Sequence, residues 1–514
     1  MFQRKNPMAK KKKKPKKQKK QSVFTPITKH SRKGKVLIPP MLGIPNVNFS
    51  SWVNDRLPEM VWAALLLTND NIVRNEALDV FRQVGKFVSK NSDNGILPEI
   101  TITGLSKFPG DKLLELLVSI TAKEKQRKAL LPLLLFDSLP AKEIWVRALS
   151  SENEEIHWEP LAHAVAKTLD HQSQEATDCR WLRVYCMMLG GKLKLPSEEL
   201  IKEIYYYPNY GDMRKVRPSI RASEGAFNML EEKHDNWPIS FWKECYEKTP
   251  CIPLNIKPNY RFKSDTKKIL QILADIYTNL VDHSFNTSKQ TDINPRHDTI
   301  FGTAFFTLLL LRELLKADNR ISISGRLILR TIVECYITLF YLIKKDDEEL
   351  WKSYRVFGTG QAKLSWLKYD DMEKKPEFID LDMLKNFANE DMWLEYVQIN
   401  LGHWEKSNLR KMSEDCGVKD VYDKYYSWTS TYTHGHWGAI RETAFDTCGN
   451  PLHRLHRIPS LKAPNHPDVV PDALQLINEM MNKVSDYYPD FKCRFDIDNC
   501  TPKIEDEGSQ TQQG

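Results

Sequence analysis

The sequence predicts an all-α protein in two parts: an N-terminal irregular, solenoid-like helical array, followed by a C-terminal helical bundle. Apolar residues recur at helical spacing over most of the chain from Leu57 onward. Strand-like composition is scarce, because only ITITGL (100–105) and IYYYPNY (204–210) have it, and both runs are short. The 514 residues are too many for one ordinary core, which favours two or three domains.

The N-terminal segment 1–35 is expected to be a disordered, Lys-rich tail. It contains fifteen Lys and Arg and no acidic residue, so self-repulsion opposes folding. Because the rest of the chain contains 60 basic and 67 acidic residues, the attraction for phosphate-rich partners is concentrated in the tail. Binding of nucleic acid or ribosomes, a nuclear address and a purely solubilising role all fit this charge, and Met8 is a second plausible start. The lysines expected to contact nucleic acid are Lys10, Lys11, Lys12, Lys13, Lys14, Lys16, Lys17, Lys19 and Lys20.

The cysteines and apolar runs indicate a cytoplasmic protein without a membrane partner. There are nine cysteines and no CxxC pair, and the closest two, Cys245 and Cys251, are six apart, which favours a reducing compartment. The apolar run FGTAFFTLLLL (301–311) is shorter than the roughly 18 residues that span a bilayer. No apolar stretch follows the basic N-terminus, so a secretory signal is not expected.

Proline-rich stretches divide the rest of the chain into domains. The linker at 36–56 is rich in Pro and Gly, and three prolines interrupt helical periodicity at 248–263. Between them, 57–247 is expected to be the N-terminal helical domain, whose array would bind a protein partner; it shows no fixed repeat length. Residues 264–490 form the expected C-terminal bundle, and 491–514 a disordered end.

The helices of the C-terminal bundle have recognisable starts and faces. Ser264 and Asp265 are a helix start signal before the first of them. The segment 322–346 is apolar nearly all round, which predicts a helix at the centre of the bundle. The helices expected here lie at 264–283, 298–319, 322–346, 346–369, 380–400, 419–446 and 470–487.

Two charges interrupt the apolar segment 322–346. Arg330 and Glu334 are four residues apart, so their side chains project from the same helix face. Burial of an isolated charge costs several kcal/mol, so each needs a partner, either the other or a residue from another helix. A purely structural ion pair is a commoner reason for two such charges than a functional site.

The stretch TYTHGHWGAIRE (431–442) supplies candidate partners. On a continuous helix over 419–446, five side chains lie within an arc of about 80°, while His436 points elsewhere. These are Tyr426, Ser430, His434, Trp437 and Arg441. Packing this polar stripe against the face of Arg330 and Glu334 would satisfy both, so a buried polar network is expected.

Two hypotheses follow for this network. In the first it is catalytic: His434 acts as a general base near Glu334, with Arg330 and Arg441 holding an anion such as a phosphodiester. Tyr426, Ser430 and Trp437 would then bind the ligand. In the second it is a structural lock that fixes helix register, and the protein is a non-enzymatic helical scaffold.

Neither a metal nor a cofactor is expected. His434 and His436 are two apart and cannot chelate one ion from a regular helix. His453 and His456 are three apart in a loop, without a carboxylate at recognisable ligand spacing. There is no GxxxxGK[ST], no GxGxxG after a strand and no GxSxG, which excludes the common nucleotide-binding and hydrolase motifs.

The pattern RTIVECYITLFYLI (330–343) followed by YSWTSTYTHG (426–435) resembles a widespread set of bacterial proteins, domain of unknown function 5677. The resemblance covers roughly 265–450. It implies an all-helical bacterial domain that sometimes occurs in mobile elements and defence-associated loci, and it brings no established reaction. The HEPN ribonuclease motif is absent, since none of the 13 histidines has an Arg five to seven positions before it. A bacterial cytoplasmic protein of defence or toxin type, directed at nucleic acid or another anionic ligand, is therefore the expectation.

Overall fold

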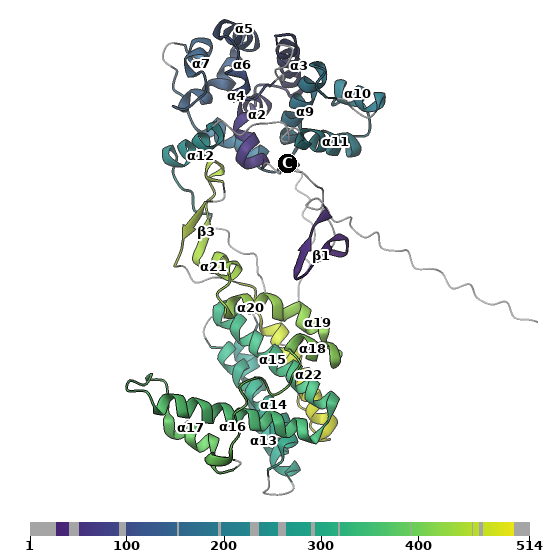
Figure 1. The fold of residues 1–514 in the computed structure, drawn as a ribbon, viewed down its shortest axis with the longest axis vertical. Helices are drawn as coiled ribbons and strands as arrows, with labels where there is room; N and C mark the ends of the chain where they lie inside the picture. The colour runs from purple at the N-terminus through teal and green to yellow at the C-terminus, as the bar shows by residue number, and fades with distance from the viewer. Residues whose placement is uncertain are drawn as a thin grey trace, which may run out of the picture. The chain divides into compact units, whose positions relative to one another are not determined.

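The computed structural model describes residues 27–40, 51–91, 99–151, 154–193, 197–226, 236–254, 264–288, 293–316, 319–390, 392–454, 456–461 and 466–497. Over these ranges the chain is all-α, as predicted, apart from two small antiparallel sheets (Figure 1). No helix among these residues is both long enough and apolar enough to cross a bilayer. The chain divides into an N-terminal unit, Met1–Ile252 with Cys448–His456, and a C-terminal unit, Pro253–Thr447 with Arg457–Gly514.

Short helices make up the N-terminal unit. They are α1 (Leu57–Glu59), α2 (Val61–Thr68), α3 (Arg74–Asn91), α4 (Ile102–Leu105), α5 (Gly110–Ile120), α6 (Glu124–Leu130), α7 (Lys142–Leu149), α8 (Glu159–Thr168), α9 (Gln174–Leu189), α10 (Glu198–Tyr205), α11 (Met213–Ala226) and α12 (Trp237–Lys248). Helix α2 is buried along its length from Val61 to Leu66, and it packs against α3, α6, α8 and α9. The array is therefore irregular, because each repeat of a solenoid contacts only its neighbours along the chain.

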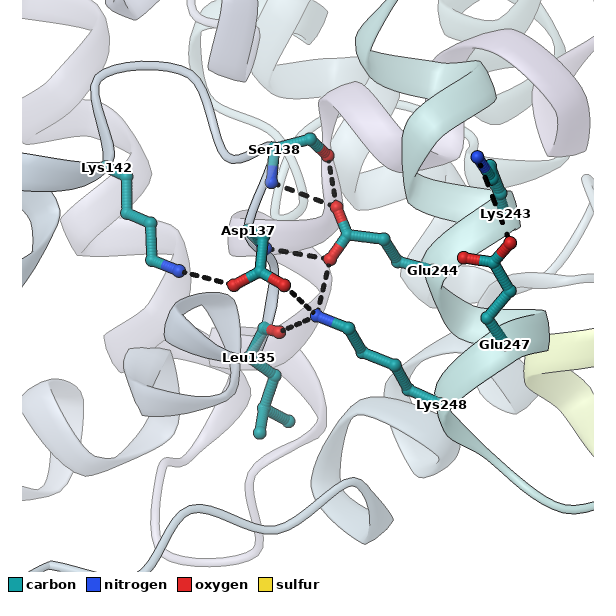
Figure 2. Close-up of polar contacts among 8 residues, drawn as sticks. All are labelled: Leu135, Asp137, Ser138, Lys142, Lys243, Glu244, Glu247 and Lys248. Carbon is teal, nitrogen blue, oxygen red and sulfur yellow. Dashed lines mark hydrogen bonds and ion pairs between the residues drawn. The ribbon is translucent and has the colours of Figure 1, made fainter.

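Hydrogen bonds and ion pairs of charged side chains connect α12 to Leu135 and the loop that follows it (Figure 2). Glu244 accepts hydrogen bonds from the backbone amides of Asp137 and Ser138, at 2.7 and 2.9 Å. One turn further along α12, the Lys248 ammonium donates to the Leu135 carbonyl at 3.0 Å and to the Asp137 carboxylate at 2.6 Å. Because hydrogen bonds to ionised groups are the strong ones, this network holds the C-terminal end of α12 in place.

The C-terminal unit is a second bundle. Its elements are α13 (Thr266–Thr287), α14 (Pro295–Leu314), α15 (Ile323–Lys345), α16 (Glu348–Asp370), α17 (Leu381–Ala388), α18 (Leu409–Asp415), α19 (Lys419–Val421), the π-helical turn η8 (Tyr422–Tyr426), α20 (Ser427–Thr433), α21 (Trp437–Ala444) and α22 (Val470–Tyr487). Helix α15 packs against α14, α18, α20 and α22, so it is the central helix that its apolar sequence predicts. The Asp265 carboxylate accepts a hydrogen bond from the Lys268 amide at 3.2 Å and caps α13, as expected.

Neither of the two strand-like runs forms a strand. Residues Ile102–Leu105 of the first run form α4, because the Thr101 hydroxyl accepts a hydrogen bond from the Gly104 amide at 3.0 Å and caps a helical turn. The second run, 204–210, contains the end of α10 and the turn after it. Local capping outweighs β-like composition in the first run.

The strands form elsewhere, at β1 (Ser31–Lys33) with β2 (Val36–Ile38), and at β3 (Phe445–Thr447) with β4 (Arg457–Pro459). The first pair corrects the expected tail and linker, since Gly34 between the strands adopts φ +61° and allows a tight hairpin. The expected disordered end at 491–514 is corrected as well, because Phe491 and Phe495 are buried against the core of the C-terminal unit. The remainder of that end, 498–514, lies outside the described residues.

Candidate functional site

Helix α15 carries an ion pair at the predicted position. The Arg330 Nη1 lies 2.7 Å from the Glu334 Oε2, one helical turn away. The side chain of Arg330 is 12% exposed and that of Glu334 is 36% exposed, so the arginine is the more buried partner. Because the guanidinium is the more shielded group, it depends on further partners from other elements.

Tyr426, the last residue of η8, is such a partner. The Arg330 Nη2 donates a hydrogen bond to the Tyr426 Oη at 2.8 Å, and the Arg330 Cζ lies 4.7 Å from the centroid of the same ring. A cation placed over an aromatic face is attracted by the ring quadrupole. The structure thus brings together Arg330, Glu334 and Tyr426 of the seven predicted catalytic and binding residues.

The continuous helix expected over 419–446 is interrupted. Helix α20 ends at Thr433, Gly435 adopts φ +57°, and α21 begins at Trp437. Glycine has no Cβ to oppose this left-handed conformation, which commonly terminates helices. The side-chain stripe calculated for one straight helix is therefore wrong beyond Thr433.

Among the described residues, the other four predicted residues form no hydrogen bond or ion pair with Arg330 or Glu334. His434 and Trp437 are exposed, and Ser430 is half-buried. Arg441 is half-buried, and its Nη2 lies 3.2 Å from the Thr447 Oγ1. The expectation that His434 belongs to a buried network is corrected, because His434 is the C-cap residue of α20 and its side chain is exposed. The catalytic and binding roles assigned to these residues stay predictions.

A second polar cluster, not predicted from the sequence, includes Arg326, which precedes Arg330 by one turn of α15. Tyr432 of α20 donates a hydrogen bond to the Glu442 carboxylate of α21, and the His466 Nδ1 lies 3.2 Å from the same carboxylate. Arg326 donates to the Pro467 carbonyl at 2.8 Å. Burial lowers the pKa of His466, and the nearby Arg326 lowers it further, against the opposing effect of Glu442. A signal was present, since Arg326 precedes Arg330 by four residues in the same apolar helix.

A cavity of about 1120 Å³ opens beside the Arg330 ion pair, with Glu334 and Tyr426 in its wall. Its aromatic lining consists of Phe306, Tyr354, Phe357, Phe387, Trp404 and Tyr426. The Cys335 thiol also lines it, and burial raises the pKa of this thiol to about 12. A thiol protonated at neutral pH is a poor nucleophile, so the cavity is better suited to binding than to covalent catalysis.

Acidic groups outnumber basic groups in the cavity wall. The charged lining residues are Asp298, Glu334, Glu390, Glu405, Arg355 and Lys406. Four carboxylates therefore face two cations. One of these cations, Arg355, is ion-paired with Asp298 at 2.8 Å and with Glu390 at 3.2 Å. Glu334 is likewise paired, with Arg330, but an ion-paired carboxylate keeps lone pairs that can accept further hydrogen bonds, so the wall is rich in acceptors.

Comparison with protein families matches the part of the chain that contains most of this cavity wall. Residues 306–449 match the model of a family of unknown function, DUF5677. This confirms the resemblance drawn from Arg330, Glu334 and Tyr426. No curated protein and no solved structure matches the chain. The segment 306–449 contains α15, α16 and α20.

Two further predictions concern other parts of the chain. The lysines predicted to bind nucleic acid, from Lys10 to Lys20, lie outside the described residues. The prediction of no metal site overlooked one group of side chains in the N-terminal unit: Cys251, Cys448, His453 and His456 have their ligand atoms within 4.8 Å of one another. Cys251 is about two hundred residues from the others, so spacing alone did not reveal the group.

Proposed function

We propose that the C-terminal unit is a binding module whose cavity takes a small molecule with a flat apolar body and a positively charged or hydrogen-bond-donating group. The observation that carries this proposal is the composition of the cavity wall, in which four carboxylates and two cations accompany six aromatic rings. Aromatic faces bind flat apolar groups and cations, and carboxylates accept hydrogen bonds. A volume of about 1120 Å³ accommodates a drug-sized ligand.

The charge balance distinguishes this ligand from the anionic one that the sequence suggested. A phosphodiester is held best by guanidinium groups, and both guanidinium groups at the cavity are ion-paired: Arg330 with Glu334, and Arg355 with Asp298 and Glu390. Lys406 adds only one ammonium to the wall. His434, the expected general base, is exposed beyond the end of α20. A binding role therefore accounts for the described residues better than phosphodiester cleavage does.

A matched pair of ligands tests the charge preference. Tryptamine and indole-3-acetate share one ring system and carry opposite charges, so calorimetric titration of the full-length chain compares the charges alone. We expect tryptamine to bind at least about tenfold more tightly, a difference of about 1.4 kcal/mol. Tighter binding of indole-3-acetate would contradict the proposal.

A blocking variant tests the location. Gly302 lines the cavity from α14, and an added Cβ there would meet nothing within 4 Å. The Cβ of Gly302→Phe should therefore be accommodated without a clash, and its ring should fill part of the cavity and abolish tryptamine binding. The matched control is Gly225→Phe on α11 of the N-terminal unit, where an added Cβ also meets nothing within 4 Å. Equal binding by wild type and Gly302→Phe would place the ligand elsewhere.

The charge of the N-terminal tail favours a second function, because residues 1–35 include fifteen basic and no acidic residues. We propose that this tail binds nucleic acid through its phosphates, without base specificity. Deletion of 1–35 should remove most of the salt dependence of RNA and DNA binding by the full chain. Binding that keeps its salt dependence after the deletion would contradict this role.

Defence or toxin activity stays a prediction that rests on the family resemblance alone. Overexpression of the wild-type chain beside His434→Ala and Glu334→Ala tests it. Growth inhibition by wild type that the variants lose, at unchanged protein level and melting temperature, would support an active site. Equal effects of all three chains would favour the alternative of a non-enzymatic scaffold.

A further inference from the structure

Four potential metal ligands meet in the N-terminal unit. Cys251 follows the end of α12 by three residues. The other three lie in the loop between β3 and β4: Cys448 directly after β3, His453 at the end of the 3-10 helix η9 (Pro451–His453), and His456 directly before β4. The loop belongs to the N-terminal unit because η9 packs against α8 and α12, and Leu452 is 1% exposed in the core of that unit.

The distances between the ligand atoms fit one tetrahedral centre. The Cys251 Sγ lies 3.5 Å from both the His453 Nδ1 and the His456 Nδ1. The Cys448 Sγ lies 3.4 Å from the His453 Nδ1. A tetrahedral zinc ion with Zn–S of about 2.3 Å and Zn–N of about 2.0–2.1 Å holds its sulfur and nitrogen ligands about 3.6 Å apart.

The orientation of His453 is set by a contact on the far side of its ring. Its Nε2 lies 3.1 Å from the Thr249 carbonyl oxygen, which can only accept a hydrogen bond, and 3.0 Å from the Thr249 Oγ1. That hydroxyl donates its own proton to the Cys245 carbonyl at 2.6 Å, so it too acts as an acceptor toward His453. The Nε2 therefore carries the proton, and the Nδ1 keeps its lone pair directed at the two sulfurs. Metal-bound histidines are commonly held by this kind of contact to a backbone carbonyl.

The backbone around the ligands is also held in place. The Asn450 Nδ2 donates hydrogen bonds to the Thr249 Oγ1 and the Pro250 carbonyl, both at 2.9 Å. The Gly449 amide donates to the Ile252 carbonyl at 2.5 Å. Cys251 therefore sits between two fixed segments, because the Glu244 and Lys248 contacts hold the end of α12 (Figure 2). Such fixed support is what a ligand set needs to keep its geometry.

Hydrogen bonds between the four side chains account for only part of this arrangement. One lone pair on the His453 Nδ1 can accept one S–H proton well, yet both thiols lie within 3.5 Å of it. One cation at the centre satisfies all the contacts at once, since each sulfur and each nitrogen then donates a lone pair to it.

We propose that Cys251, Cys448, His453 and His456 bind one zinc ion as a structural site. Two thiolates and two imidazoles are a zinc ligand set, and four protein ligands leave no open position for a substrate. Binding releases the two thiol protons to the solvent. The ion links Cys251, after the end of α12, to the three ligands of the β3–β4 loop. It thereby cross-links two positions about two hundred residues apart, which lowers the entropy of the unfolded chain.

Metal analysis of the untagged full-length chain tests the site. We expect about one zinc per chain in wild type and less than about one fifth of that in the Cys251→Ser/Cys448→Ser double variant. The matched control, Cys416→Ser/Cys493→Ser, removes two half-buried thiols outside the cluster and should keep its zinc. Wild type without bound zinc, or a double variant with the full amount, would overturn the proposal.

Cobalt binding tests the geometry without relying on the folding of any variant. Zinc is removed from the wild-type full chain with a chelator, and Co²⁺ is added. We expect the strong visible bands of tetrahedral cobalt and a near-ultraviolet thiolate-to-cobalt charge-transfer band, both displaced by one equivalent of zinc. Weak octahedral bands without charge transfer would show that the thiols are not ligands and would overturn the proposal.

Discussion

The guanidinium of Arg330 lies over the ring of Tyr426, with 4.7 Å between its Cζ and the ring centroid, and donates to the hydroxyl of the same residue at 2.8 Å. These two contacts are separable by substitution. Tyr426→Phe keeps the ring and removes the hydroxyl, so it should lower the free energy of unfolding by about 1.5–3 kcal/mol, the range for a hydrogen bond to a charged group. Tyr426→Leu also removes the ring attraction and should cost more.

Calorimetric unfolding of the full chain measures both variants. Equal losses for Tyr426→Phe and Tyr426→Leu would show that the ring contributes nothing beyond its hydroxyl. The matched control is Tyr396→Phe, at a tyrosine that is 70% exposed, and this should leave unfolding unchanged.

Two helical glycines of the C-terminal unit should respond in opposite ways to alanine. At Gly302 of α14 an added Cβ meets nothing within 4 Å, so Gly302→Ala should stabilise by about 0.5–1 kcal/mol through reduced backbone freedom of the unfolded chain. At Gly360 of α16 the Cβ would lie 2.5 Å from the Gln398 carbonyl oxygen. Gly360→Ala should therefore destabilise the unit, and calorimetric midpoints that move in the same direction would contradict the assignment.

The C-terminal unit should lose stability in mild acid because of two histidines. Burial lowers the pKa of His297, against the opposing effect of Asp298, and burial lowers that of His466. Both folded-state pKa values lie below the 6.5 of a free histidine, so between those values the unfolded state binds more protons. The stability they contribute is complete above about pH 6.5 and is lost as the pH falls through the folded-state pKa values.

Melting temperatures between pH 7.5 and pH 5 measure this loss, with buffers of equal ionic strength. His297→Gln should flatten the pH dependence, whereas His157→Gln, at an exposed histidine, should leave it as in wild type. A pH dependence that is unchanged in His297→Gln would show that this histidine does not carry the effect.

Periodicity and local composition were sufficient to predict most of the C-terminal unit. The start of α13 followed from Asp265, and the central place of α15 followed from its apolar faces. The pairing of Arg330 with Glu334 followed from their spacing, because neighbours four apart share a helix face. The failure came at Gly435, where one residue in a left-handed conformation ends α20 and redirects every side chain after it.

The remaining contacts depend on tertiary structure, which spacing does not contain. Tyr432 and Glu442 lie on two helices that the sequence analysis treated as one. Cys251 reaches the loop 448–456 because that loop packs into the N-terminal unit, which no local pattern indicates. The cavity likewise needs α14, α15, α16 and α17 together, so only its position beside Glu334 was foreseeable.

The N-terminal unit contains a fully buried carboxylate among three arginines. Glu224 of α11 is 0% exposed; its carboxylate contacts Arg56, lies 2.7 Å from the Arg183 Nη1 and lies 3.5 Å from the Arg180 Nε. Arg180 is 6% exposed, and this burial lowers the pKa of its guanidinium to about 10. The Glu224 carboxylate therefore compensates the positive charge of buried guanidinium groups that are shielded from water.

Removal of that carboxylate charge should be among the most destabilising single changes in the chain. Glu224→Gln leaves three shielded guanidinium groups around a neutral amide, and loss of one partner from a buried ion pair costs about 3–5 kcal/mol. Combining it with Arg180→Met, which removes the least compensated cation, should recover part of the loss, because like charges then repel less.

Glu115→Gln, at an exposed carboxylate paired with Lys112, serves as the control and should leave the midpoint of urea unfolding unchanged. If Glu224→Gln behaves like Glu115→Gln, or if Arg180→Met worsens it, the three arginines are compensated by other groups, and Glu224 is not the centre of the cluster.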